Sequence, residues 1–379
     1  MKATLKVTRV ATIPEIERLV PVWERIATQD VREGFFRSPC WYLTWIRYIR
    51  PDVSPMVLVV RDQEEIVAIA PLSCGRTRSR LRILSLAGND LVCGEYLDFP
   101  SLPGYRQLAL ESIWAELLGG ELEWDLLSLS AMRTEGDLFW EAHKRAQADG
   151  LMLRSEERIC PFVQLPTTFE EYLARFSKRR RKHFVRTRRI FKDHGAEVKI
   201  YRSGPELESA IPRLIDLHCA RWKTVGKPGT LGQPGFAEFL LTLGRKQASE
   251  GAVRLYTLEV GGLAKAAMLN FHFGTSAFQF QNGFDPAWKL AKHSPGTVLI
   301  LHGIETAVAE GCHVYDFLRG AEEYKFHFAD RSKPITDVRL ARTLRGKLFL
   351  CAASVRPCLA RLRPRRRGPA AREWIFLPR

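Results

Sequence analysis

A weak internal repeat constrains the fold of this chain more than any other feature of its sequence. Met56–Leu72 reads as a strand, a polar turn and a second strand. Leu255–Asn270 has the same form, and Gly261-Gly262 supplies a tight hairpin turn. Two hairpins alone could arise by chance, so the segments that follow them decide whether the chain is duplicated.

Both hairpins are followed at a similar distance by a Pro-Gly pair that opens an apolar helix. These pairs are Leu102-Pro103-Gly104 and Ser294-Pro295-Gly296. Each helix leads into a strand with an aromatic residue and an Asp at its start, Trp124–Leu129 and Tyr315–Gly320. Three features in the same order predict a duplicated α/β domain.

The length of 379 residues agrees with two domains, because one hydrophobic core rarely supports so long a chain. We expect an N-terminal domain at residues 1–157, a C-terminal domain at 158–340 and a basic tail at 341–379. The apolar runs, such as Leu348–Ala353, are far shorter than the roughly 20 residues that span a bilayer. Eight scattered cysteines without a CxxC pair indicate neither a disulfide framework nor a zinc site, and we expect a cytoplasmic protein without a metal.

The net charge of +16 is concentrated in two segments. Ser177–Lys192 carries +9 and Ala341–Arg379 carries +10, so the remaining residues sum to −3. The first segment lies in an expected helix that Thr168 caps and that continues to His194, with Gly195 as its stop. Its charges either form a solvated helix face or border a cleft that receives a polyanion. The polyanion would be a tRNA or the phosphates of an acyl carrier.

The second Pro-Gly loop is the segment with the most informative chemistry. Ser294 is a natural N-cap, Pro295 suits the first helical position, and Gly296 lets another group approach the backbone closely. A helix start presents free N–H groups and the positive end of the dipole, which suits a pyrophosphate. Taken alone, the loop is better explained as a well-capped helix, but Lys289, Lys292 and His293 just before the cap favour an anion site.

The same residues resemble the CelD/BcsL-type branch of the GCN5-related N-acetyltransferases (GNAT), a branch similar to the FemAB aminoacyltransferases. The resemblance rests on FDPAWKLAKHSPGTVLILHGIETAVAEG and on YDFLRGAEEYKFHF, which is similar to a D-F-x-x-G-x-x-x-Y-K element. It implies an α/β fold of two tandem acetyltransferase-like domains, each a twisted mixed sheet flanked by helices. It extends well over Pro161–Arg342 and more loosely over Phe36–Ala131.

The resemblance also implies where an acyl carrier, acetyl-CoA or a longer acyl-CoA, would lie. Ser294, Pro295, Gly296 and Thr297, with Lys292, would form its pyrophosphate loop. Gln279–Phe284 would supply the strand edge whose amides polarise the thioester, beside a neighbouring strand that splays away. The usual Q/R-x-x-G-x-G/A loop is replaced here by K-H-S-P-G-T. The N-terminal half lacks the lysines and the Ser cap, so we expect a degenerate domain that walls the cleft.

Direct acyl transfer from a thioester to an amine needs a group that takes a proton, donors for the oxyanion and an acid for the leaving thiolate. Asp316 is the first candidate for holding or deprotonating the amine, although an Asp that caps the turn at Gly320 is an equal alternative. The resemblance places Tyr324 as acid and Lys325 as a carrier or substrate contact, with Arg319 as a further substrate contact. His272 ranks last as a base, because its strand alternation indicates a core histidine.

Three functions remain open from the sequence. The first is an acyl-CoA-dependent N-acyltransferase acting on an amino sugar or another small-molecule or glycan amine connected with exopolysaccharide. The second is a FemAB-like transferase that uses aminoacyl-tRNA, and the third is a non-catalytic binding module. The tail combines GKLFLCAASVRPCLARL, an arginine cluster and WIFLP, with Pro357, Pro364 and Pro369 expected to prevent one long helix. It indicates either peripheral contact with an anionic inner membrane surface or docking on the body of the protein.

Overall fold

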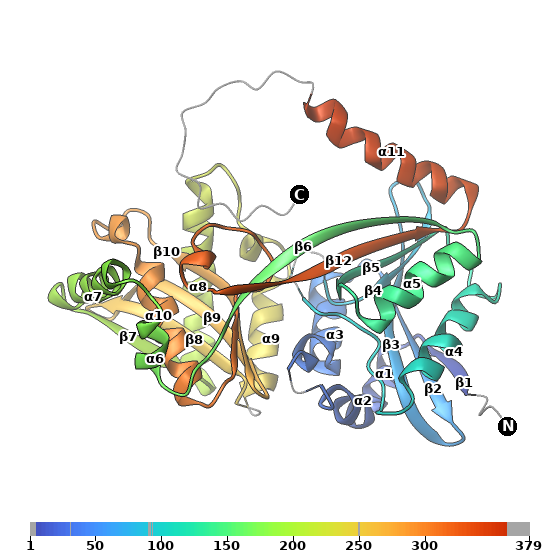
Figure 1. Cartoon of the computed structure of the whole chain (residues 1–379), viewed down its shortest axis with the longest axis horizontal. Coiled ribbons are helices and arrows are strands. Elements are labelled where there is room, and N and C mark those ends of the chain that lie inside the picture. Colours follow the sequence, from blue (N-terminus) through green and yellow to red (C-terminus); the bar gives the residue numbers. More distant parts are fainter. Residues whose placement is uncertain (1–4, 31, 90–91, 93, 249–250, 362–379) are drawn as a thin grey trace.

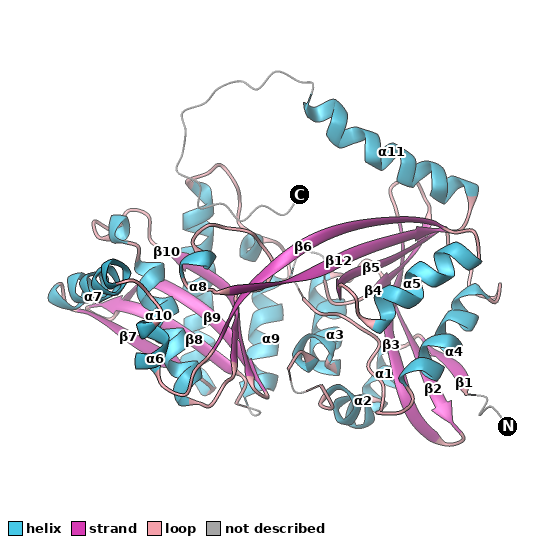
Figure 2. Cartoon of the chain, viewed as in Figure 1, coloured by secondary structure: helices cyan, strands magenta, loops and turns pink. Residues whose placement is uncertain are grey.

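The computed structural model describes the chain except for residues 1–4, 31, 90–91, 93, 249–250 and 362–379. The described residues form one mixed sheet of twelve strands, in the order β1-β2-β3-β4-β5-β12-β6-β11-β10-β9-β8-β7. Helices flank this sheet in each half, and the two halves lie side by side (Figures 1 and 2).

The N-terminal half contributes one end of the sheet and the helices around it. Its strands are β1 (Lys6–Val10), β2 (Ser54–Asp62), β3 (Glu65–Arg76), β4 (Arg82–Leu86) and β5 (Leu126–Arg133). Its helices are α1 (Ile13–Arg18), α2 (Val20–Ala27), α3 (Pro39–Thr44), α4 (Arg106–Leu118) and α5 (Asp137–Ala148). The short turns η1 (Gly34–Arg37) and η2 (Trp45–Ile49) flank α3. β2 and β3 form the first predicted hairpin, and α4 follows the first Pro-Gly pair as expected.

The C-terminal half repeats this pattern. Its strands are β7 (Ala196–Tyr201), β8 (Val253–Val260), β9 (Leu263–Phe273), β10 (Ser276–Phe284) and β11 (Val314–Asp316). Its helices are α6 (Phe169–Ala174), α7 (Lys178–Asp193), α8 (Gly204–Lys223), α9 (Phe236–Ala248) and α10 (Pro295–Ala309). α8 and α9 join the core cluster that continues into the N-terminal half, whereas α6, α7 and α10 pack a separate cluster. The second predicted hairpin and the helix after the second Pro-Gly pair are both present.

Two long central strands exchange partners between the halves. β6 (Met152–Gln164) follows α5 of the N-terminal half, and its last residues pair with β11 of the C-terminal half. β12 (Arg331–Ala341) follows β11, and it pairs with β5 of the N-terminal half on one side and with β6 on the other. These two strands arch from one half to the other in Figure 1. Each half therefore completes the sheet of the other.

Two sequence expectations about single elements are wrong. The basic helix does not run unbroken from Thr168 to His194, because it divides into α6 and α7 at Ser177, whose backbone is extended. Thr168 caps the first helix as expected, and the Ser177 Oγ accepts a hydrogen bond from the Arg180 N–H of the second at 3.3 Å. The strand expected at Tyr315–Gly320 ends at Asp316, whose Oδ1 accepts from the Leu318 N–H at 2.7 Å and so fixes a turn.

The tail begins with a helix, α11 (Leu344–Arg361), that continues through Pro357. The expectation that Pro357 prevents a long helix is therefore wrong. Leu350 anchors α11 by packing against Leu81 and Leu126, and the C-terminal end of the helix extends away from the body in Figure 1. Pro364, Pro369 and the WIFLP segment lie outside the described residues.

Candidate functional site

Strands β10 and β11 separate partway along their length. Their parallel pairing joins Ser276–Phe278 to Val314–Asp316, where β11 ends. β10 continues to Phe284, with a β-bulge between Gln279 and Gln281 that shifts its register against β9. The splayed strands that the family resemblance implied are thus present, and the edge of Gln279–Phe284 is free of pairing with the described part of β11.

Tyr324 lies beside this edge. It precedes the single turn η6 (Lys325–His327). Its hydroxyl is buried beside the Asn282 and Gln279 side chains of β10, and burial raises the pKa of Tyr324 well above its usual range. The phenol therefore keeps its proton at neutral pH.

The start of α10 differs from the expected cap. Ser294 occupies the N-cap position, but its backbone is left-handed (φ 61°) and its side chain makes no capping hydrogen bond. Instead, the Thr297 N–H donates to the Ser294 carbonyl at 2.9 Å and closes the first turn. A side chain on Gly296 would meet no atom of the described residues within 4 Å. The helix start is therefore open to a ligand. Pro295 has no N–H and the Thr297 N–H is engaged, so the Gly296 N–H is the first-turn donor that remains for a ligand.

The residues before this turn are basic and exposed. Lys292 is exposed, and it lies in the turn η5 (Ala291–His293) directly before Ser294. The preceding Trp288 packs against Phe191 near the end of α7, with ring centroids 5.2 Å apart. The loop and the basic helix therefore lie next to each other.

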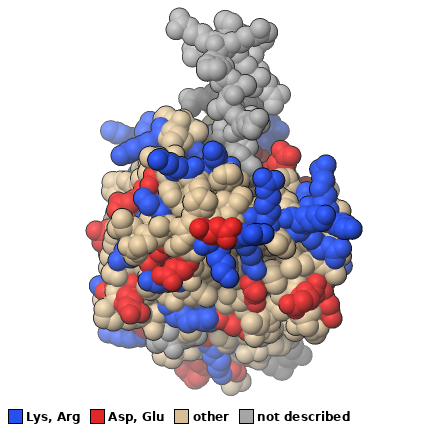
Figure 3. Space-filling view, turned by 90° about the vertical axis from the view of Figure 1, so that its left-hand side faces the viewer, with Lys and Arg blue, Asp and Glu red and all other residues tan. Residues whose placement is uncertain are grey.

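The outer face of α7 is densely basic. Arg180 and Arg188 are engaged, since Arg180 donates to the His327 carbonyl at 3.0 Å and Arg188 pairs with Glu305 of α10 at 2.6 Å. The remaining basic side chains are exposed: Lys178, Arg179, Arg181, Lys182, Arg186, Arg189 and Lys192. Basic side chains gather on the face of the molecule shown in Figure 3. One face of α7 therefore packs against the protein, and its other face is an exposed basic surface.

Asp316, Arg319 and Lys325 lie at the junction of the two halves. The Asp316 carboxylate is buried, accepts from the Tyr96 hydroxyl at 2.7 Å and pairs with Lys333 of β12 at 3.0 Å. The Arg319 guanidinium pairs with buried Glu95, with Nη2 to Oε2 at 2.9 Å. These contacts join the end of β11 to the N-terminal half.

Lys325 is fully buried beneath the same turn. Its ammonium donates to the Leu318 and Arg319 carbonyls at 3.2 and 2.6 Å and pairs with Glu322 at 3.1 Å. Burial lowers the pKa of Lys325. Burial would also lower the pKa of Lys333, but Asp316 and Glu33 raise it above its usual value. The roles that the sequence assigned to Asp316, Arg319 and Lys325 stay predictions.

His272 lies away from the splayed edge. In the β9–β10 ladder, His272 lies opposite Ala277 at the beginning of β10, whereas the splay begins at Gln279. Its Nδ1 lies 2.8 Å from Glu310, which also holds Arg254. The structure therefore brings Tyr324 and the α10 loop to the splayed end of β10 and keeps His272 at the opposite end.

His218 of α8 is a polar neighbour of the splayed edge that the sequence did not reveal. Its Nδ1 lies 2.9 Å from the Asn282 carbonyl, which can only accept, so this nitrogen carries the proton. Its Nε2 is buried and has no partner among the described residues, and burial lowers the pKa of His218 to about 4. Gly283 allows this contact, because a side chain there would lie 2.2 Å from the His218 backbone nitrogen. A helical histidine gives no local sequence signal of this kind.

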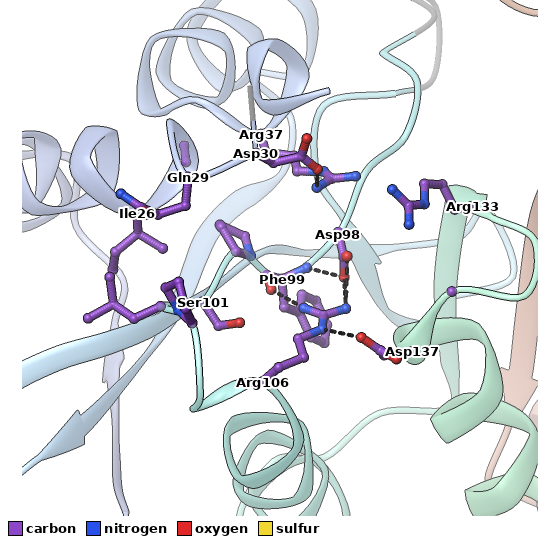
Figure 4. Close-up of a pocket in the computed structure, with 15 residues that line it drawn as sticks. Ile26, Gln29, Asp30, Arg37, Asp98, Phe99, Ser101, Arg106, Arg133 and Asp137 are labelled. Atoms are coloured by element: carbon purple, nitrogen blue, oxygen red, sulfur yellow. Dashed lines mark hydrogen bonds and ion pairs between the residues drawn. The ribbon is translucent and has the colours of Figure 1, made fainter. Parts of the chain in front are cut away.

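A polar pocket of about 280 Å³ lies in the N-terminal half (Figure 4). It is lined from α2, from the loop before α4 and from the start of α5. Arg106, the first residue of α4, donates to both oxygens of Asp98 at 2.6 and 2.8 Å and to Asp137 at 3.1 Å. The helix start that corresponds to the open turn of α10 is therefore occupied by the chain's own ion pairs.

Two further features of the described residues bear on function. None of their helices is long and apolar enough to cross a bilayer. They also contain no group of three or more His, Cys, Asp or Glu side chains that could hold a metal ion.

Comparison with known proteins identifies the domain that these elements form. Residues 177–326 match the family described as acetyltransferase (GNAT) domain. No curated protein matches the chain. The matched residues run from α7 to η6, so they include the α10 loop, the splayed strands and Tyr324.

Several solved structures share the fold over most of their length. The structure of FemX is 10% identical, covers 91% of this chain and 99% of its own, and has a TM-score of 0.59. The C-terminal domain of a putative lysylphosphatidylglycerol synthetase from Agrobacterium fabrum is 11% identical, with coverages of 90% and 97% and a TM-score of 0.53. L-PGS from Bacillus licheniformis is 10% identical, with coverages of 90% and 96% and a TM-score of 0.51.

These findings confirm the predicted α/β fold of two tandem GNAT domains, each a mixed sheet flanked by helices. The match of residues 177–326 to a GNAT domain supports the general class of N-acyltransferases. At such low identity the structural neighbours bear on the fold alone.

Proposed function

We propose that this protein is an acyl-CoA-dependent N-acyltransferase that transfers the acyl group directly to an amine. The observation that carries the proposal is the splayed edge of β10, which leads into an open, positively charged helix start at α10. A thioester carrier needs both parts, a site for its phosphates and a strand edge for its acyl arm.

The carrier's pyrophosphate would lie at the start of α10. Ser294, Pro295, Gly296 and Thr297 would surround it. Gly296 would donate its backbone N–H, Ser294 and Thr297 would offer their hydroxyls, and Lys292 would add a positive charge. The acyl arm, acetyl or longer, would follow Gln279–Phe284, where backbone amides polarise the thioester carbonyl. The bulge in β10 turns part of this edge away from the regular ladder and supports such a role.

In the proposed reaction, the neutral amine attacks the thioester carbonyl. The new C–N bond forms, the C–S bond breaks, the nitrogen loses a proton and the thiolate of coenzyme A gains one. Tyr324 would donate that proton, since its phenol is protonated beside the strand edge. Asp316 would hold the amine or take its proton, with Arg319 and Lys325 as substrate contacts. The amine would have to enter where Tyr96 and Lys333 cover Asp316.

The acceptor would be an amino sugar or another amine of the cell envelope or exopolysaccharide. This part of the proposal rests on the CelD/BcsL-type resemblance of the FDP…SPG and Y-K segments. The reaction would take place in the cytoplasm, with the protein in contact with the inner membrane surface.

A FemAB-like transfer from aminoacyl-tRNA is the second candidate, and the exposed basic face of α7 favours it. One structural neighbour is also named as a putative lysylphosphatidylglycerol synthetase, a name that refers to an aminoacyl group. In this case tRNA affinity would fall steeply with salt, and charge reversal at Arg179 and Arg181 would remove most of it. If α7 only borders the carrier cleft, tRNA will bind weakly and RNase will leave activity unchanged.

The proposed chemistry is tested by two substitutions with one control. Asp316→Asn and Tyr324→Phe should each lower turnover about a hundredfold or more, with little effect on coenzyme A affinity. Tyr201→Phe removes a hydroxyl of β7 that donates to Glu259, and it should keep the wild-type rate. Turnover is followed by release of the coenzyme A thiol. Wild-type rates in both site variants would remove these residues from the mechanism.

The tail would contribute the membrane contact. Leu344 and Leu348 of α11 lie one turn apart and are 73% and 62% exposed, which is unusual for leucine. Segment 341–379 carries a net charge of +10. An apolar stripe in a basic segment fits an anionic membrane surface, where each basic residue adds about 1 kcal/mol.

A further inference from the structure

We propose that the polar pocket of the N-terminal half binds the acceptor by an oxyanion, which the Arg133 guanidinium holds. The inference rests on the proposed function, because it assigns the acceptor's position in the same reaction. It names the acceptor's chemical class as a small amine that also carries a phosphate or a carboxylate. The following observations carry it.

The pocket is a built cavity with charged walls. Its volume of about 280 Å³ suits one sugar ring or one amino acid unit and excludes a folded polymer. The labelled side chains in Figure 4 converge on it from α2, β5, the loop before α4 and the start of α5. Six charged residues line it: Asp30, Arg37, Asp98, Arg106, Arg133 and Asp137.

Two of its three arginines are already engaged by the protein. Arg37 is 8% exposed and pairs with Asp30 at 2.7 Å and Glu33 at 3.3 Å, while its Nε donates to the Tyr96 carbonyl. Arg106 is held by Asp98 and Asp137. Acceptors of the protein itself thus hold all three nitrogens of each guanidinium, so both side chains shape the walls.

Arg133 is the lining arginine whose guanidinium is most accessible to a ligand. Its side chain is 55% exposed, and its contact among the described residues is one long ion pair, Nη1 to Glu33 at 3.3 Å. The rest of the planar donor fork can therefore face a ligand, and it matches the two oxygens of a phosphate or carboxylate. Asp137, at the start of α5, is 65% exposed, so it can accept from a hydroxyl or ammonium group of the same ligand.

A chain of ion pairs links this cation to the end of β11. The Glu33 carboxylate that contacts Arg133 also contacts Lys333 at 3.0 Å, and Lys333 contacts Asp316 at 3.0 Å. Two shared charges thus separate the pocket from the residue proposed to hold the amine. A molecule anchored at Arg133 would lie on the side of the junction from which the amine must approach.

The internal repeat argues against a second carrier site here. In the C-terminal half the turn at the start of α10 is open, whereas Arg106 closes the start of α4. A pyrophosphate would have to displace three carboxylate hydrogen bonds of Arg106. The C-terminal half therefore binds the carrier at α10, and the N-terminal half binds the acceptor's anion at Arg133.

The test is calorimetric titration of the full-length protein with three amines of similar size. Glucosamine 6-phosphate carries a phosphate, glucosaminate carries a carboxylate, and glucosamine carries neither. We expect saturable binding of one or both anionic amines, at least tenfold tighter than that of glucosamine. Arg133→Gln should remove this preference, and Arg133→Lys should keep part of it because the charge stays but the fork is lost.

Arg25→Gln is the matched control. Arg25 is also 55% exposed and also makes a single ion pair at 3.3 Å, with Glu65, but it does not line the pocket. Its loss should leave the preference intact. Equal affinity for all three amines, no saturable binding, an unaffected Arg133→Gln variant or an equal loss in Arg25→Gln would each overturn the proposal. Coenzyme A titrated into Arg133→Gln should bind as in the wild type, so failure of the carrier site is detected separately.

Discussion

Tyr324 joins the sequence motif to the geometry of the site at the scale of single residues. The motif around it predicted a functional group, and the fold buries its hydroxyl beside Asn282 and Gln279 at the splayed edge of β10. Asp316, from the same motif, instead joins the halves through Tyr96 and Lys333. One motif thus serves both the strand edge and the domain junction.

His218 should make the protein less stable in mild acid. Its folded-state pKa of about 4 lies below the ordinary value of 6.5. Between these two pH values the unfolded chain binds a proton at this histidine and the folded chain does not. The resulting stability is fully present above pH 6.5 and is lost as the pH falls through 4. At pH 4.5 the loss is about 2–3 kcal/mol relative to pH 7.

Urea unfolding at pH 7 and pH 4.5 measures this loss. His218→Gln keeps an amide donor for the Asn282 carbonyl but cannot titrate, so its free energy of unfolding should fall less between the two pH values. An identical fall in wild type and variant would show that His218 does not titrate in this range. His143, which is partly exposed on α5, supplies the control variant His143→Gln, whose fall should match the wild type.

At the scale of elements, the start of α10 and the edge of β10 form one unit. The proposed carrier loop lies at a helix start without a side-chain cap, where Ser294 is left-handed. The basic helix α7 lies alongside through Phe191 and Trp288. Its charges therefore border the proposed carrier site, whether or not they also contact a longer polyanion.

Helix α11 should bring the protein to anionic membranes. Leu344→Glu with Leu348→Glu places two negative charges on the exposed apolar face, and it should abolish co-sedimentation with vesicles of phosphatidylglycerol and phosphatidylcholine. Both positions are exposed, so the fold should tolerate the change. A wild-type protein that stays in the supernatant at low salt would contradict the membrane contact, as would an unaffected double variant.

The sequence predicted those elements whose signals are local. The hairpin that Gly261-Gly262 predicted and the helices that the two Pro-Gly pairs predicted are present where they were expected. The break at Ser177 and the left-handed Ser294 were missed although their hydrogen bonds are local, because the apolar spacing of residues 169–191 suggested one helix and Ser294 suggested an ordinary N-cap. The contact of His218 and the Arg133 pocket were missed because tertiary contacts assemble them from separate segments.

At the scale of the whole molecule, strand exchange makes the two domains interdependent. β12 enters the sheet between β5 and β6, and the end of β6 completes the sheet at β11. Two ion pairs lie at the junction, Asp316 with Lys333 and Arg319 with Glu95. The carboxylates of both pairs are buried, so water could not replace a lost partner. The cleft geometry is therefore built into the fold instead of depending on a linker.

The two halves should unfold as one cooperative unit. Leu340→Ala on β12 removes a fully buried side chain and should cost about 2–5 kcal/mol. Hydrogen exchange of β2 in one half and of β8 in the other should accelerate by the same factor. Faster exchange confined to β2, or two separate calorimetric transitions, would show that the domains are independent.

Binding of coenzyme A is the most direct test of the central claim. Calorimetric titration should show saturable binding to the wild type. Gly296→Val should weaken it at least a hundredfold without lowering the melting temperature, because the side chain enters open space that the pyrophosphate needs. Equal affinity in both proteins would place the carrier elsewhere. A wild type that binds tRNA but no coenzyme A would contradict an acyl-CoA-dependent transferase outright.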